Sequence, residues 1–259
     1  MTPEFVPVSA ARSRCVVAGA VVVLCGAVFV TPILGGVDSG AQARKNCRLS
    51  RAELAALPSW LRPRRATVLV DSVLLGGVPA LRARRQCWRL RVYGRPALMI
   101  RFAASELRQR SARVARLVVV GLGYNSLWER GRRRYGVWSR RFDREARNLL
   151  RTLRRLGARQ VVWVTLREPT PRTVPPQARG ELGRYSWYFP YVNERLRRLD
   201  RSRDDLVLAD WAKASNRRGV TYDSIHLNPQ GAALMAKTIW GTVSREARRQ
   251  TKPAAPVRS

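Results

Sequence analysis

Short apolar runs alternate along this chain with longer segments in which apolar residues recur every three or four positions. The short runs are rich in β-branched residues and predict buried strands at 66–70, 88–92, 116–122, 159–165 and 205–210. The longer period is typical of amphipathic helices and predicts them near 97–110, at 139–156, at 190–202 and after Pro229-Gln230-Gly231. The stretch SVLLGGVPALRARR, which follows the first run, predicts a loop that enters a helix.

Continuous apolar strands that alternate with helices indicate a parallel sheet covered on both faces. Connections of this type are right-handed, so helices lie on both sides and the expected fold is a three-layer α/β domain. We expect this domain to span 66–245. The remaining parts are a short N-terminal segment at 1–14, an apolar segment at 15–37, a linker at 38–65 and a disordered basic tail at 246–259.

The apolar segment 15–37 contains 23 residues without a charge. A helix of about 20 apolar residues spans a bilayer, so the segment could be an uncleaved transmembrane anchor. It could also be a signal peptide, because Ala41-Gln42-Ala43 resembles a small-residue cleavage site. Both alternatives place the α/β domain outside the cytoplasm, either at the cell membrane or secreted after cleavage near Ala43.

Basic residues outnumber acidic residues by 50 to 17, and all but four of the basic residues are arginine. The formal net charge of +33 is spread along the whole chain and favours polyanionic partners, such as anionic lipid or anionic envelope polymers. A solvated arginine-rich surface without a partner would give the same composition. Nucleic acid is a weaker candidate, because no nucleic-acid-binding motif is visible.

Two of the four cysteines, Cys47 and Cys87, lie outside the apolar segment. Outside the cytoplasm they could form a disulfide, although two independent thiols fit the sequence equally well. The chain has one histidine and no C-x-x-C spacing, so we expect no metal site and no cofactor.

The connection 166–189 is long and proline-rich, and it ends in the aromatic stretch RYSWYFPY. Connections of this length are often functional lids. The alternative is a surface excursion whose aromatic side chains pack on the core.

Candidate catalytic residues follow the predicted strands, at the edge where ligands bind in parallel α/β sheets. Ser72 comes directly after the first strand and could be a nucleophile, provided that a base removes its proton. His226 is the only histidine available as that base, and Asp223, three residues earlier, could hold its ring in one tautomer. We expect the neighbouring Asp71 to brace the turn or cap a helix.

An oxyanion hole could be built from residues at the same edge. The backbone of Ser72 is one candidate donor, and Gly94 has no side chain, so its backbone N–H could approach a developing oxyanion. Asn125 could direct a side-chain N–H at the same point.

These residues lie in four blocks: VDSVLLG at 70–76, YGR at 93–95, GLGYN at 121–125 and DSIHLNPQG at 223–231. In order and content the blocks resemble those of the SGNH (GDSL-type) esterase and acyltransferase superfamily. The LADW stretch at 208–211 resembles one subgroup, the SGNH domain of bacterial membrane acyltransferases that O-acetylate surface polysaccharides. One departure is Val70, which stands where the first block of the family has glycine.

The resemblance implies a flavodoxin-like sandwich of about five strands and catalysis through an acyl-Ser72 intermediate. The expected substrate is an acylated carbohydrate or lipid ester of the cell envelope. The basic stretch 129–141, interpreted as a loop, could steer an anionic polymer towards the site. The alternatives are a catalytically weak SGNH domain that binds anionic envelope polymers, and a protein that binds polyanions through charge alone.

Overall fold

The computed structural model describes residues 57–59, 61, 64–84, 88–109, 113–126, 135–183 and 186–251. Among these residues, no helix combines the length and the apolar composition that a membrane span requires. The apolar segment 15–37, the linker up to residue 56, Cys47 and Cys87 lie outside the described residues, so the predicted anchor and disulfide stay predictions.

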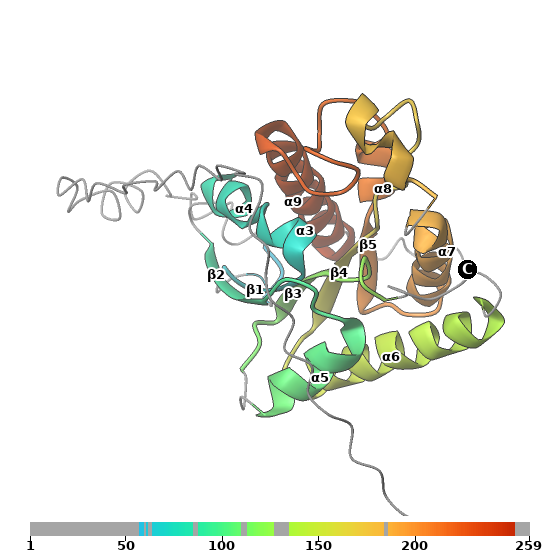
Figure 1. Cartoon of the computed structure of the whole chain (residues 1–259). Helices are drawn as coiled ribbons and strands as arrows, with labels where there is room; N and C mark the ends of the chain where they lie inside the picture. Colours follow the sequence, from blue (N-terminus) through green and yellow to red (C-terminus); the bar gives the residue numbers. More distant parts are fainter. Residues whose placement is uncertain are drawn as a thin grey trace, which may run out of the picture. The chain divides into compact units, whose positions relative to one another are not determined.

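Five parallel strands form one sheet in the order β2-β1-β3-β4-β5 (Figure 1). Their bounds are Arg65–Val70 for β1, Arg89–Gly94 for β2, Leu117–Gly121 for β3, Gln160–Val164 for β4 and Leu206–Ala209 for β5. All five predicted strands are therefore confirmed. The order is that of flavodoxin-like folds, in which the chain reverses direction between β1 and β3 and opens a crevice at their carboxyl ends.

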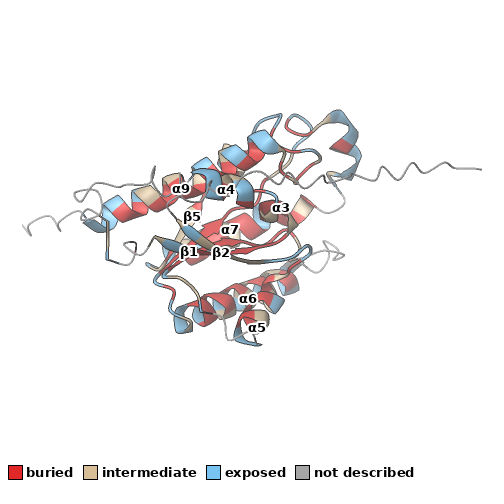
Figure 2. Cartoon of the chain, turned by 90° about the vertical axis from the view of Figure 1, so that its left-hand side faces the viewer, coloured by how far each residue is buried: buried red, intermediate tan, exposed pale blue. Residues whose placement is uncertain are grey.

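Helices cover both faces of the sheet. Helices α4 (Val78–Arg84) and α9 (Pro229–Thr251) pack together on one face, and α5 (Ile100–Gln109) packs with α6 (Tyr135–Arg155) on the other (Figures 1 and 2). Helix α7 (Phe189–Arg201) contacts α6 and β5. The remaining helices are α3 (Ser72–Leu75), η2 (Pro176–Glu181), η3 (Ser186–Tyr188) and α8 (Trp211–Ala214).

Burial explains why the strands have continuous apolar sequences. Every residue of β3 and β4 is buried, because helices cover both faces of these central strands (Figure 2). Strand β2 lies at the edge of the sheet, and its residues alternate between exposed and half-buried positions over most of its length. The three-layer α/β class expected from the sequence is confirmed.

Several helix boundaries differ from the sequence expectation, and Ser72–Leu75, expected to begin a loop, forms the short helix α3. Helix α6 begins at Tyr135, so residues 135–141 of the basic stretch form helix and not loop. Helix α9 continues to Thr251, six residues into the expected tail, where Glu246 and Ala247 are buried. Glu246 accepts hydrogen bonds from Arg249 and Gln250. The polar side chains that suggested a disordered tail are therefore hydrogen-bonded within the helix.

The connection 166–189 contains the two short helices η2 and η3. At its end, Tyr188 and Phe189 are fully buried, and the Phe189 ring packs edge-on against Tyr124 at a centroid distance of 5.1 Å. These two aromatic side chains belong to the core. This agrees with the second interpretation of the connection, a surface excursion whose aromatic side chains pack on the core.

Candidate active site

Ser72 is the first residue of α3, directly beyond the carboxyl end of β1. The sharp turn from strand to helix is stabilised by Asp71, whose Oδ1 accepts a hydrogen bond of 3.1 Å from the backbone N–H of Val73. This contact makes Asp71 the N-cap of α3. The expected capping role of Asp71 is confirmed. The cap leaves the Ser72 side chain half-buried at the carboxyl end of the sheet.

Three side chains that are far apart in sequence form a continuous hydrogen-bonded series at this edge. Asp223 Oδ2 lies 2.7 Å from His226 Nδ1, and His226 Nε2 lies 3.3 Å from Ser72 Oγ. An ionised carboxylate only accepts hydrogen bonds, so Nδ1 carries the ring proton and Nε2 is free to accept from the Ser72 hydroxyl. The structure thus brings together the three residues predicted to act as nucleophile, base and orienting acid.

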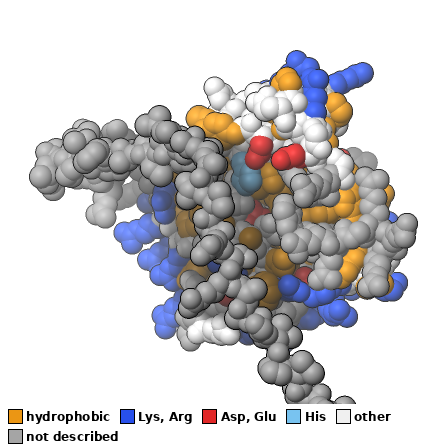
Figure 3. Space-filling model, viewed as in Figure 1, with side chains coloured by type: hydrophobic (Ala, Val, Ile, Leu, Met, Phe, Trp, Pro, Cys, Tyr) orange, Lys and Arg blue, Asp and Glu red, His pale blue; other side chains and the backbone are white. Residues whose placement is uncertain are grey.

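The loop that carries the acid and the histidine is held by its own backbone. The N–H groups of Ile225 and His226 both donate to Asp223 Oδ1, each at 2.7 Å. The other oxygen of Asp223 is thereby left for the imidazole. Both side chains stay accessible, with 45% of His226 and 39% of Asp223 exposed, and Figure 3 shows the single histidine of the chain at the open surface.

The electrostatics of the pair favour separated charges. Partial burial alone would raise the pKa of Asp223, but hydrogen bonds from the His226 ring and from two backbone N–H groups lower it to about 2. The same hydrogen bond to Asp223 raises the pKa of His226 above its usual value, against the opposing effect of desolvation. A basic imidazole beside a permanently ionised carboxylate is suited to accept a proton.

A second carboxyl group lies beneath the nucleophile. Asp71 is fully buried, and this burial raises its pKa to about 7, although backbone N–H groups of Val73, Leu74 and Tyr124 and the charge of His226 oppose the shift. Asn125 Nδ2 donates to Asp71 Oδ2 at 3.4 Å. Asp71 therefore holds both the turn that presents Ser72 and the amide of the predicted oxyanion-hole residue Asn125.

Gly94, the third predicted oxyanion-hole residue, ends β2 beside the end of β1, where it is the register partner of Val70. No hydrogen bond among the described residues joins Gly94 to Ser72 or Asn125, so its predicted role stays a prediction. Packing supplies a different reason for glycine. A Cβ at position 94 would lie 2.5 Å from Val70 Cγ2 and 2.6 Å from the Val70 carbonyl oxygen. Both the side chain and the backbone of Val70 therefore exclude a Cβ at position 94.

We expect Gly94→Ala to lower the free energy of unfolding by about 1–3 kcal/mol, because the added methyl group overlaps backbone as well as side chain. Chemical denaturation of the variant and the wild type measures the change. Gly136→Ala is the matched control, since a Cβ at that helical position has no atom within 4 Å. Equal stability of the Gly94→Ala variant and the wild type would contradict the close approach of the two strand ends.

The sequence analysis missed Arg167, which follows β4 at the same edge of the sheet. Arg167 is 1% exposed, and its Nη2 donates to the carbonyl oxygens of Thr173 and Arg217. It therefore ties the connection after β4 to the loop that leads to Asp223, and burial lowers the pKa of its guanidinium. Its position just beyond a predicted strand is the sequence signal that could have identified it.

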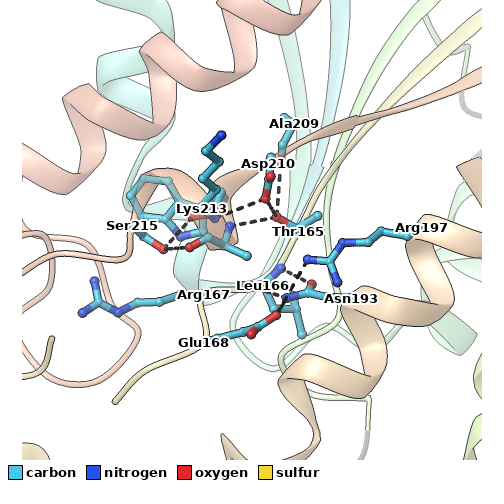
Figure 4. Close-up of polar contacts among 12 residues, drawn as sticks. Thr165, Leu166, Arg167, Glu168, Asn193, Arg197, Ala209, Asp210, Lys213 and Ser215 are labelled. Atoms are coloured by element: carbon cyan, nitrogen blue, oxygen red, sulfur yellow. Dashed lines mark hydrogen bonds and ion pairs between the residues drawn. The ribbon is translucent and has the colours of Figure 1, made fainter. Parts of the chain in front are cut away.

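The backbone around Arg167 is fixed by polar contacts, of which those of Asn193 with Leu166 are buried (Figure 4). Asn193 of α7 accepts a hydrogen bond from Leu166 N at 2.7 Å and donates to Leu166 O at 2.8 Å. Asp210, from the LADW stretch, caps α8 through Lys213 N and contacts Thr165 Oγ1. The Arg167 side chain extends away from the Asn193 contacts. The strand ends that surround the site are thus rigidly held.

The parallel sheet of order 2-1-3-4-5 and the Ser72–His226–Asp223 series together define an α/β sandwich with a candidate serine-hydrolase site. Among known proteins, no family model and no curated protein matches the sequence. Solved structures do match, and they are GDSL/SGNH hydrolases of low sequence identity. The chain therefore has the SGNH (GDSL-type) fold that the sequence blocks indicated.

Three of these structures illustrate the similarity. An acetyl xylan esterase has 17% identity and a TM-score of 0.55, over 69% of this chain and 99% of that one. The C-terminal catalytic domain of peptidoglycan O-acetyltransferase A of Streptococcus pneumoniae has 16% identity and a TM-score of 0.50, over 73% of this chain and 95% of that domain. A GDSL-like lipase of Bacteroides thetaiotaomicron has 13% identity and a TM-score of 0.53, over 80% and 98%.

Proposed function

We propose that the chain is a serine esterase or O-acyltransferase that acts on ester-linked acyl groups of cell-envelope carbohydrate or lipid. The observation that carries this proposal is the series of contacts from Asp223 through His226 to the Ser72 hydroxyl. A histidine with a purely structural role also accepts and donates hydrogen bonds, so hydrogen bonding alone does not distinguish a catalytic histidine. A serine at a capped strand-to-helix turn, facing the free nitrogen of a carboxylate-bound imidazole, is the arrangement that nucleophilic catalysis requires.

The geometry supports a two-step reaction. His226 Nε2 takes the proton of Ser72 as Oγ attacks the carbonyl carbon of the ester, and Asp223 stabilises the resulting imidazolium. Collapse of the tetrahedral intermediate breaks the ester C–O bond, and His226 returns the proton to the departing alcohol. Water then cleaves the acyl-Ser72 ester in a hydrolase, whereas a sugar hydroxyl takes the acyl group in a transferase, with His226 again as the base.

Donors for the oxyanion lie on two elements. The backbone N–H of Ser72 belongs to the first turn of α3, where helical N–H groups have no acceptor within the helix. Asn125 Nδ2 uses one hydrogen for Asp71 and has a second one available for a substrate oxygen. Fixed donors of this kind stabilise the charge that develops on the carbonyl oxygen.

The acyl group and the location of the domain depend on features outside the Ser72–His226–Asp223 series. Two fold neighbours are named an acetyl xylan esterase and a peptidoglycan O-acetyltransferase, which favours acetylated carbohydrate as the first substrate to test. The uncharged run 15–37 favours a domain held at the cell membrane and exposed outside the cytoplasm, or secreted after cleavage near Ala43.

Labelling of the full chain with a fluorophosphonate probe tests the proposal. We expect the wild type to be labelled on Ser72 and to hydrolyse short aryl acetates, and we expect the Ser72→Ala variant to do neither. Ser105→Ala is the matched control, because the Ser105 hydroxyl only donates to a backbone carbonyl within α5 and should leave labelling unchanged. A folded wild type that resists the probe and hydrolyses no aryl acetate would refute the enzymatic function.

A further inference from the structure

A groove of about 700 Å³ lies at the amino end of the sheet, opposite the carboxyl edge that carries Ser72. It is formed by the starts of β1 and β2 and by the segment 113–116 that leads into β3. Of the ten described residues that line it, five are arginines and none is acidic; these arginines are Arg65, Arg89, Arg91, Arg113 and Arg116.

All five arginines are exposed, and none forms an ion pair within the part of the chain that the structure describes. Other arginines do find acidic partners, for example Arg195 with Asp143 and Arg203 with Asp205. The positive charge of the groove is therefore uncompensated by the described residues around it.

The sheet forces these like charges together. Arg65 and Arg89 are register partners in neighbouring parallel strands, and such strands lie about 4.8 Å apart. Arg91 lies two residues beyond Arg89 and so extends from the same face of β2. Like charges on facing residues of neighbouring strands are destabilising, so the arrangement costs stability unless an anion lies between them.

We infer that this groove binds a linear anionic glycan, whose carboxylate or phosphate groups are held by the five arginines. Guanidinium groups match the geometry of both oxyanions, because each can donate two parallel hydrogen bonds. Five arginines that come from three segments and line a hollow of this volume fit a chain with several charges better than a single ion.

The remaining lining residues indicate which class of polyanion the groove can hold. They are small or aliphatic, and none of the lining residues that the structure describes is aromatic. Single-stranded nucleic acid is usually held by bases stacked on aromatic side chains, and these described residues offer no such platform. A membrane surface is flat on this scale, whereas the arginines line a concavity. Basic side chains gather on the side of the molecule where β2 lies (Figures 1 and 3).

The groove goes beyond the proposed function, because binding there requires no reaction at Ser72. It lies at the far end of β1, a strand of six residues that spans about 20 Å. A polymer held at one end of the sheet would raise the local concentration of its own ester groups near the other end.

The test compares two variants of the full chain that each lose four positive charges. The groove variant replaces Arg65, Arg89, Arg113 and Arg116 with glutamine, and keeps Arg91, which donates a hydrogen bond to the Arg113 backbone. The control variant replaces four exposed arginines of α6 that line no such groove, namely Arg140, Arg144, Arg147 and Arg151.

Binding of labelled polygalacturonate oligomers and of polyphosphate is measured in neutral detergent at about 0.15 M salt, where the long-range field is largely screened. We expect the groove variant to bind polygalacturonate about tenfold more weakly than the wild type, and the α6 control to stay within about twofold. Loss of polygalacturonate binding alone would identify carboxylates as the ligand groups. Loss of polyphosphate binding alone would overturn the glycan as the ligand, because polyphosphate contains no sugar.

Equal weakening of both variants would overturn the inference in favour of diffuse charge attraction, and so would a wild type without saturable binding. If the wild type binds single-stranded DNA more tightly than it binds either polymer, and the groove variant loses this binding, the ligand of the groove is nucleic acid and not a glycan. Hydrolysis of a small aryl acetate is measured on the same variants. The groove variant should keep the wild-type rate, so a failure of the groove and a failure of the catalytic proposal are distinguishable.

Discussion

Replacing His226 with alanine is expected to lower kcat for ester hydrolysis by about 10⁴-fold, with little change in KM. Among the described residues, the imidazole is the group placed to take the Ser72 proton, at 3.3 Å from Oγ, and the chain has no second histidine to substitute for it. Steady-state kinetics with an aryl acetate measure the effect.

The pH profile gives the same prediction a second readout. The base must be neutral, so wild-type activity should fall as pH decreases through the pKa of His226, which the bond to Asp223 raises. The His226→Ala variant should lack this step. Tyr222→Ala, which removes an exposed side chain from the same loop, is the control and should keep both rate and profile. If the His226→Ala variant retains a tenth of the wild-type activity or more, His226 is not the base.

Asp223→Asn is expected to be as damaging as the loss of the base, at about 10⁴-fold in kcat. Two backbone N–H groups donate to Asp223 Oδ1, so the carbonyl oxygen of an asparagine must take that place. Its NH₂ group then faces His226 Nδ1, which must become an acceptor. The ring proton moves to Nε2, and the imidazole can no longer accept the proton of Ser72.

The single histidine makes this tautomer directly observable. Nitrogen-15 NMR of the ring should show a proton on Nδ1 in the wild type and on Nε2 in Asp223→Asn. Asp223→Ala should show no fixed tautomer and should be no less active than Asp223→Asn. A variant that keeps both the wild-type tautomer and the wild-type rate would show that Asp223 does not orient the ring.

Local patterns were sufficient to predict the strands and most helices, because buried parallel strands have continuous apolar sequences, as in β3 and β4. The helix ends were less predictable. Residues 246–251 look polar, yet they are helical, because Glu246 and Ala247 are buried and Gln250 reaches Gln160 of β4. Contacts of this kind depend on tertiary structure and leave no periodic signal.

The candidate site likewise contains residues that could be predicted from the sequence and features that could not. Ser72, Asp223 and His226 were predictable because residue type and position after a strand are both visible in the sequence. The buried state of Asp71 and Arg167 was not, because neither residue type nor spacing shows that a charged side chain is covered by other segments. The packing reason for Gly94 was equally hidden, since the side-chain and backbone atoms of Val70 that exclude a Cβ lie on another strand.

The buried carboxyl group of Asp71 couples folding to proton uptake. Its pKa of about 7 in the folded domain lies above the usual value of 3.8, so the native state holds a proton that the unfolded chain releases between these pH values. The contribution of Asp71 to stability is therefore present at low pH and is lost as pH rises through this interval. Asp223, with a pKa of about 2, acts in the opposite sense and stabilises the fold above its usual pKa. Two carboxyl groups of one site thus give the domain opposite responses to acid.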